Sequence, residues 1–182
     1  MTDSNHPHSL DRIGRWALVV GALAFGIFWE STLFDIGIPW VIALSIHGLS
    51  FVAIPFGLIQ LERSAATGGT PMGWSGVALV IVGGFASFVL LAVGLSLLAV
   101  SLWIKPGWRA VPSVLIAGSI TLLLSYLLGA RVGTEDAPDP SSEAAVLFGA
   151  AGFLIPIGLV LIGAKQAAIA RSREEGLSTA HS

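Results

Sequence analysis

His47 is the residue of this sequence best suited to chemistry in an apolar environment. It lies nine residues into an apolar stretch that begins at Ile38, which is about 14 Å along a helix at 1.5 Å per residue and near the middle of a bilayer. An imidazole at that depth can carry a proton or bind a ligand. The alternative is a neutral, hydrogen-bonded histidine that only packs, because a neutral imidazole is far cheaper to bury than a charge. The candidate hydroxyl partners are Ser45, Ser50, Ser87 and Thr121.

Two carboxylates form a second candidate site. Glu30 lies about one turn before the end of the first apolar stretch, and Asp35 follows it in the next turn. Together they could bind a cation, a proton or a cationic ligand at the mouth of a helical bundle. The alternative is two solvated carboxylates at a membrane interface. Glu30 and His47 lie at different depths, so we do not expect a direct pair between them.

The sequence offers no other recognisable chemistry. Cysteine is absent, which excludes disulfides, thiolate metal sites and cysteine catalysis. No serine-hydrolase, zinc-protease, phosphate-loop or dinucleotide-binding signature is present. The remaining axial-ligand candidates for haem lie outside the apolar stretches, at Met1, His6, His8, Met72 and His181. We therefore expect no enzyme and no cofactor or metal, and the net charge of −2 without a long basic run argues against nucleic acid as a partner.

The candidate residues must be positioned by membrane helices. The chain is 54% hydrophobic and only 11% charged, whereas soluble domains carry roughly 25% charged residues. Five apolar stretches cover residues 16–34, 38–61, 74–104, 110–130 and 144–164, and about 20 residues span the hydrocarbon core as a helix. We predict an all-α polytopic integral membrane bundle of five transmembrane helices over 13–164, in the plasma membrane. A flexible polar N-terminal tail (1–12) and a polar C-terminal tail (165–182) flank it.

The orientation of five spans is nearly a tie on the positive-inside rule. The first helix favours a cytoplasmic N-terminus and the last helix a cytoplasmic C-terminus, and only an even number of spans satisfies both. A break at Gly83-Gly84 would provide a sixth span, but the two halves would be only about 17 residues each and marginal as spans. The sequence therefore predicts five spans with the N-terminus in the cytoplasm.

Small residues mark two candidate helix-packing seams. One recurs every fourth residue, at Ser113, Ala117, Thr121, Ser125 and Gly129. The other comprises Gly76, Gly83, Ser87, Gly94 and Ser101. Small side chains let helix backbones approach closely in lipid. The seams therefore predict packing of 74–104 against 110–130, with a homo-oligomer interface or a hydroxyl-lined polar pathway as alternatives.

These features favour a non-enzymatic membrane subunit or accessory protein that acts through helix contacts with itself or with a membrane protein partner in the lipid bilayer. The alternative is a carrier of a small molecule, or a proton-linked carrier, that uses His47 and Glu30. Pro55 and Pro156, which interrupt two of the apolar stretches, would bend their helices and could act as its hinges. An intramembrane enzyme is a third and weaker hypothesis.

Overall fold

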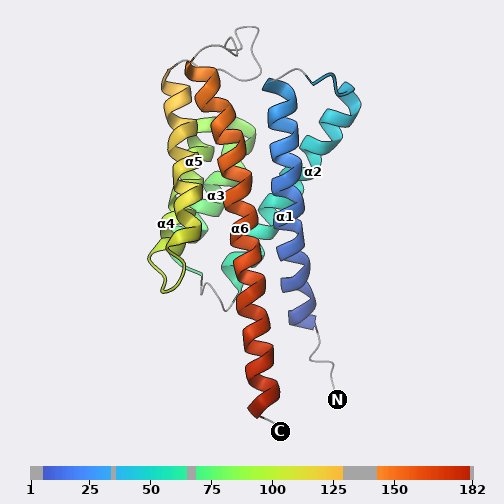
Figure 1. The fold of residues 1–182 in the computed structure, drawn as a ribbon, viewed down its shortest axis with the longest axis vertical. Helices are drawn as coiled ribbons and strands as arrows, with labels where there is room; N and C mark the ends of the chain where they lie inside the picture. Colours follow the sequence, from blue (N-terminus) through green and yellow to red (C-terminus); the bar gives the residue numbers. More distant parts are fainter. Residues whose placement is uncertain (1–5, 34–35, 65–68, 129–142, 181–182) are drawn as a thin grey trace.

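The computed structural model describes residues 6–33, 36–64, 69–128 and 143–180, and these residues are helical except for their connections (Figure 1). The six helices are α1 (His6–Leu33), α2 (Trp40–Arg63), α3 (Pro71–Ala86), α4 (Phe88–Trp103), α5 (Ala110–Leu127) and α6 (Glu143–Ala180). No strand occurs in the described part. The all-α architecture expected from the sequence is confirmed.

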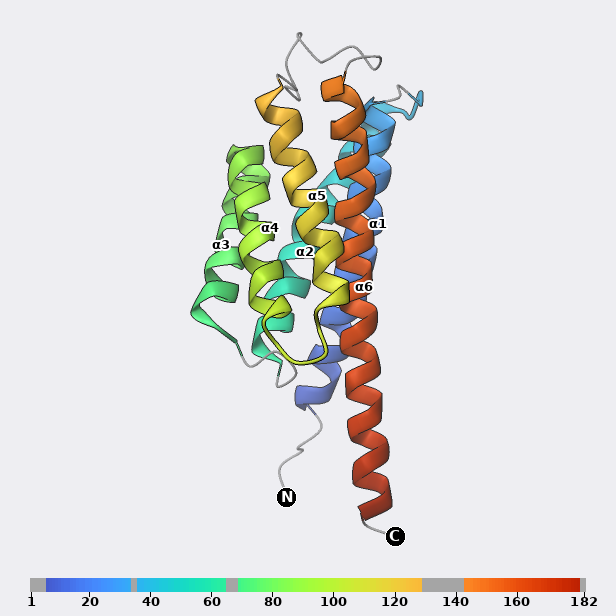
Figure 2. The same ribbon diagram turned by 60° about the vertical axis from the view of Figure 1, so that its left-hand side comes forward.

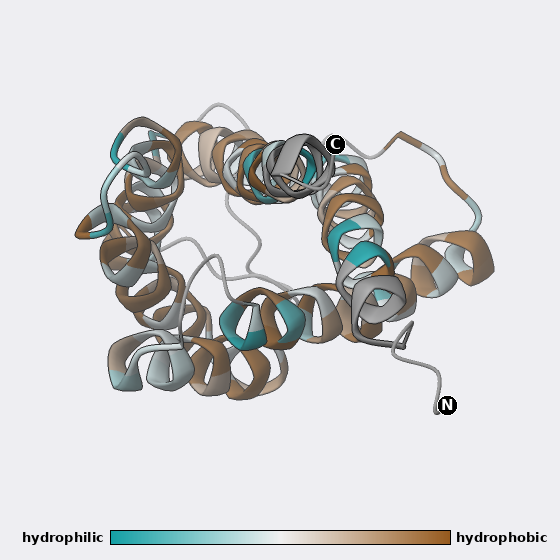
Figure 3. Cartoon of the chain, turned by 90° about the horizontal axis from the view of Figure 1, so that it is seen from below, coloured by the Kyte–Doolittle hydropathy of each residue, from teal (hydrophilic) through white to brown (hydrophobic). Residues whose placement is uncertain are grey.

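The helices alternate in direction, so the first residues of α1 and the last residues of α6 lie at the same end of the molecule (Figure 1). We call this the terminal end, and the other the distal end. α1 packs along both α2 and α6, α3 pairs with α4, and α5 lies between α4 and α6. α2 has only sparse contact with α3. Viewed from the terminal end, the helices are arranged in a ring (Figure 3).

The single helix expected over residues 74–104 is instead a hairpin of two 16-residue helices, α3 and α4. The break falls at Ser87, whose extended backbone (φ −168°, ψ 128°) ends α3, and whose hydroxyl accepts a hydrogen bond from the Val89 N–H at 3.2 Å to cap α4. Hydropathy does not detect this break because both halves are apolar. The short helices reach less far towards the distal end than α5 and α6 (Figure 2).

Glycines allow the hairpin to close. A Cβ added to Gly76 would lie 2.7 Å from the Leu98 nitrogen, and one added to Gly94 would lie 2.6 Å from the Val80 nitrogen. Real Cβ atoms essentially never come within 3.0 Å of other heavy atoms. Backbone therefore meets backbone along this hairpin, as small residues permit in membrane helices.

Four described helices are long and apolar enough to cross a membrane: α1, α2, α5 and α6. α3 and α4 are apolar but shorter, about 24 Å each at 1.5 Å per residue. The count of five spans is not confirmed. Two helix boundaries also differ from expectation. α1 already begins at His6, and α6, which is 38 residues long in all, extends to Ala180 through the segment expected to be a tail.

The distribution of apolar side chains is that of a membrane protein. Leucines such as Leu58, Leu98 and Leu122 are fully buried between helices. Large apolar side chains are nevertheless exposed, with Val52 72% and Phe85 74% accessible. Soluble proteins rarely expose so much contiguous apolar surface. These helices are therefore compatible with insertion in lipid.

The terminal end of the bundle is tied together by Glu62. This residue is 1% exposed at the end of α2, and its Oε2 accepts a hydrogen bond from the Thr70 N–H, which precedes α3, at 3.3 Å. Its carboxylate also fills the space where Gly73 lacks a side chain. An anion at this position suits the positive end of the α3 dipole. α2 and α3 are thus joined at the terminal end and diverge towards the distal end.

Candidate functional site

The divergence of α2 from α3 leaves a cavity of about 500 Å³ in the distal half of the bundle. It is bounded by the last turns of α1, the first half of α2, the tip of the α3–α4 hairpin and the first half of α6. Three of its twenty lining residues, Thr32, His47 and Ser50, have polar side chains other than tryptophan. A cavity of this size suits a small organic molecule. Because the lining is almost entirely apolar, an apolar molecule fits it best.

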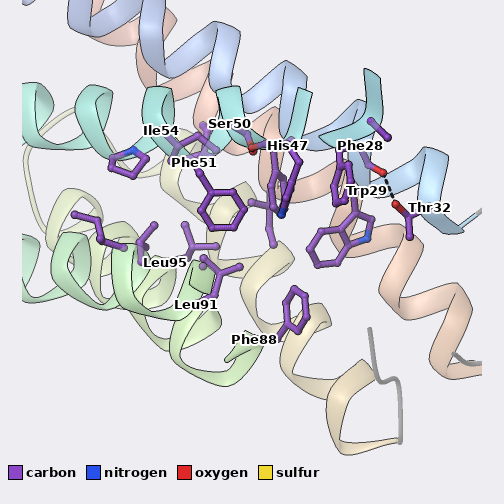
Figure 4. A pocket seen from close by; sticks show the side chains of 18 of the residues that line it. Phe28, Trp29, Thr32, His47, Ser50, Phe51, Ile54, Phe88, Leu91 and Leu95 are labelled. Atoms are coloured by element: carbon purple, nitrogen blue, oxygen red, sulfur yellow. Dashed lines mark hydrogen bonds between the residues drawn. The ribbon is translucent and has the colours of Figure 1, made fainter. Parts of the chain in front are cut away.

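His47 projects into the cavity from α2 and lies among aromatic rings (Figure 4). The imidazole stacks on Phe28 of α1, with centroids 3.9 Å apart and an interplanar angle of 25°. It meets Phe51 edge-on at 4.4 Å, and Phe51 contacts Phe85 of α3 at 4.5 Å. His47 Nδ1 is buried without a hydrogen-bond partner. His47 therefore brings hydrogen-bonding capacity to an otherwise aromatic wall.

Trp29 forms the opposite wall. Its indole N–H donates to the Phe148 carbonyl of α6 at 3.0 Å, and its ring stacks on Phe148 with centroids 4.2 Å apart. Phe88, at the start of α4, meets the Trp29 ring edge-on at 5.5 Å, and Phe25 lies 5.0 Å away. These rings join α1, α4 and α6, so this wall is more fixed than the α2 wall.

The expected hydroxyl partners of His47 are used locally. Ser45 donates to the Val41 carbonyl and Thr121 to the Ala117 carbonyl, each one turn back in its own helix. Ser50 lines the cavity but donates to the His47 backbone carbonyl at 2.7 Å. None of these bonds reaches the imidazole.

Glu30 lies away from the cavity, at the contact between α1 and α6. Its side chain is 9% exposed, and neither carboxylate oxygen has a hydrogen-bond partner. A Cβ added to Gly152 of α6 would overlap Glu30 Oε1. The structure does not bring Glu30 to His47, which faces α1 from the other side. Asp35, its expected companion, lies outside the described residues.

The two small-residue seams have different positions. Gly76, Gly83 and Gly94 lie between α3 and α4, where an added Cβ would meet the backbone of the partner helix. Ser87 forms the break, and Ser101 is fully buried. In α5, Ser113 and Ala117 are exposed, Thr121 is half-buried, Ser125 is buried, and Gly129 lies outside the described residues. The face of α5 that packs on α6 contains Leu115 and Gly118, which meet Gly158 and Ile155.

The sequence interpretation missed Glu62, which lies one residue beyond the predicted end of its span. Lys105, in the connection between α4 and α5, interacts electrostatically with Glu62. Partial burial lowers the pKa of Lys105 below its ordinary value, and the attraction of Glu62 opposes this shift. The signal available in the sequence was a glutamate directly beside an apolar run.

Comparison with known proteins adds no relative. The chain matches no protein-family model, no curated protein sequence and no solved structure.

Proposed function

We propose that this chain is an integral membrane protein that binds an apolar small molecule in the cavity between α2 and the α3–α4 hairpin. The observation that carries the proposal is the cavity itself, which is about 500 Å³ in volume and lined almost entirely by apolar side chains. Protein interiors are normally close-packed, and empty space of this size is costly unless a ligand fills it.

The lining favours a planar, unsaturated ligand with one polar group. Aromatic side chains from four helices surround the space, including Phe28, Phe51 and Phe88. Aromatic rings interact favourably with planar π systems in stacked or edge-on geometry. His47 can exchange a hydrogen bond with a carbonyl or hydroxyl group of the ligand. A ring with an apolar tail, such as a prenylated quinone, has this chemistry.

The ligand would enter sideways, from the lipid. The first half of α2 packs loosely, with Trp40 71% exposed, while the buried residues of α2 all lie at Ser50 or beyond. Pro55 removes one helical hydrogen bond between these two parts of α2, which makes the helix easier to bend there. An apolar ligand that is already dissolved in the bilayer does not need to reach the cavity through water.

We also propose that both termini lie in the cytoplasm and that the α3–α4 hairpin inserts from that side. Seven of the nine Lys and Arg residues lie near the terminal end or in the α2–α3 and α4–α5 connections: Arg12, Arg15, Arg63, Lys105, Arg109, Arg171 and Arg173. Lys165 lies in the terminal half of α6, and Arg131 is in the α5–α6 connection. For five spans the positive-inside rule hardly distinguishes the two orientations. With both termini on one side, it clearly favours the orientation in which the terminal end is cytoplasmic.

Filling the cavity tests the binding proposal. Ala43→Phe places a ring in the cavity from α2, and Val52→Phe is the matched control because Val52 lies on α2 but faces outward. The probe is decylubiquinone, titrated into protein in lipid nanodiscs and followed by quenching of tryptophan fluorescence. We expect saturable quenching for the native chain and Val52→Phe, and at least a tenfold weaker affinity for Ala43→Phe. Equal titrations in all three proteins would refute the proposal.

Single cysteines test the topology, because the natural chain has none. Thr2→Cys and Pro106→Cys should react with an impermeant maleimide from the same face, and Ile36→Cys from the opposite face. Five spans would place Thr2 and Pro106 on opposite faces. That labelling pattern would rule out the hairpin topology.

A membrane subunit that acts through helix contacts is the competing proposal. It has less support, because among the described residues of the α5 seam only Ser113 and Ala117 are exposed, and the glycine seam is used within the α3–α4 hairpin. A stable homo-oligomer that Ala117→Leu dissociates, together with absent quinone binding, would favour it over ligand binding.

A further inference from the structure

Glu30 is a buried carboxyl group without a partner. More than nine-tenths of the residue is inaccessible, and neither oxygen accepts a hydrogen bond in the described structure. No charged side chain of the described residues interacts with the Glu30 carboxyl group, so burial alone affects whether it carries a charge. An unpaired carboxylate in an apolar membrane interior is strongly unfavourable. A bound cation or a proton would therefore stabilise the carboxyl group at this position.

The adjoining turn of α6 supplies an acceptor that also lacks a donor. Pro156 has no N–H, so the carbonyl of Gly152, four residues earlier, loses its helical hydrogen bond. This carbonyl is on the α1 side of α6, because a Cβ added to Gly26 would lie 3.7 Å from its oxygen. Gly26 is one turn before Glu30 on α1, and a Cβ added to Gly152 would overlap Glu30 Oε1. The carbonyl freed by Pro156 and the unpartnered Glu30 carboxyl group thus belong to the same contact between α1 and α6.

We propose that Glu30 is a proton-binding site, in which the carboxyl is held as the neutral acid and donates its proton to the Gly152 carbonyl oxygen. One proton then satisfies both groups. A metal ion fits less well, since Ca²⁺ takes about six to eight oxygen ligands and Mg²⁺ six. The carboxyl group and one carbonyl provide at most three.

Among the residues that the structure describes, no other titratable group competes at this position. On α6, Glu143 lies nine residues before Gly152 and Lys165 thirteen after it, about 13 and 20 Å along the helix. On α2, His47 is enclosed by Phe28 and Phe51, and Glu62 is at the terminal end. Loss of the proton would leave a charge at the α1–α6 contact, and no side chain of the described residues would balance it. Trp29, the neighbour of Glu30, would transmit the change to the cavity through its bond to Phe148.

Infrared spectroscopy of the full chain in detergent tests the site, because the C=O stretch of a neutral carboxylic acid is separate from the bands of carboxylates. At pH 7 we expect the native protein to show this band, Glu30→Gln to lose it and Glu143→Gln, which changes an exposed glutamate, to keep it. The glutamine amide can donate to the same carbonyl, so Glu30→Gln should fold.

Pro156→Ala tests the partner. The new N–H at position 156 would occupy the Gly152 carbonyl, so the acid band should move to higher frequency as its hydrogen bond weakens. An unchanged frequency would count against Gly152 as the acceptor, because a carbonyl oxygen that accepts a second hydrogen bond holds each donor less strongly. The absence at pH 7 of any acid band that Glu30→Gln removes, or its appearance only when sodium is withdrawn, would overturn the proton site without depending on Pro156→Ala.

Discussion

Replacing Gly76 with alanine should push α3 and α4 apart. The added Cβ would lie 2.7 Å from the Leu98 nitrogen, whereas ordinary contact begins at 3.4 Å, so the backbones must separate by about 0.7 Å. A gap of about 0.5–1 Å forfeits roughly a quarter to a half of the dispersion energy of the contacts involved. Overpacking of this kind costs about 1–3 kcal/mol.

The same substitution at Gly48 is the matched control. Gly48 lies inside α2, and a Cβ there would meet nothing within 4 Å. Both substitutions remove the unfavourable helix propensity of glycine, worth about 1 kcal/mol. That gain cancels between the variants, so Gly76→Ala should be less stable than Gly48→Ala by about 1–3 kcal/mol, the cost of the overpacked contact.

Reversible unfolding of both variants in mixed micelles, with increasing denaturing detergent, measures this difference. The native protein should fall between the two variants or close to Gly76→Ala. If Gly76→Ala were as stable as Gly48→Ala, the close approach of α3 and α4 at this point would be refuted, and with it the hairpin that forms one wall of the cavity.

Two further predictions concern single interactions. Trp29→Phe should lower the free energy of unfolding by about 1 kcal/mol through loss of its hydrogen bond to the Phe148 carbonyl, measured by thermal unfolding in detergent, whereas Trp16→Phe at an exposed site should change it little. Because burial lowers the pKa of Lys105 from 10.5, the unfolded chain binds more protons at this residue than the folded chain, so the melting temperature should rise with pH towards 10.5. Lys105→Met should reduce that rise, and an identical pH dependence in both proteins would contradict the burial of Lys105.

The sequence predicted the helical class and most helix positions because long apolar runs are a direct consequence of a lipid-facing surface. It could not locate the break at Ser87, since one serine in an apolar run leaves hydropathy unchanged. The positive charges at the two ends each favour a cytoplasmic terminus, which agrees with the even number of crossings that we propose.

The candidate site was only partly accessible to sequence reasoning. The depth of His47 follows from its place in the apolar run, but its stacking on Phe28 depends on how α1 and α2 pack. Pro156 was visible as a kink, yet only the packed helices place the carbonyl that it frees beside Glu30. Periodicity predicted a stripe of small residues on α5 but did not predict that Leu115 and Gly118 would lie in the contact with α6.

The length of α6 has a practical consequence. Its 38 residues extend about 57 Å at 1.5 Å per residue, and its last turns project past the other helices as a continuous rod (Figures 1 and 2). A soluble protein joined to that rod through an unbroken helix would be held at a fixed angle to the bundle. Such a fusion would add the mass and asymmetry that cryo-electron microscopy needs to align particles of so small a protein.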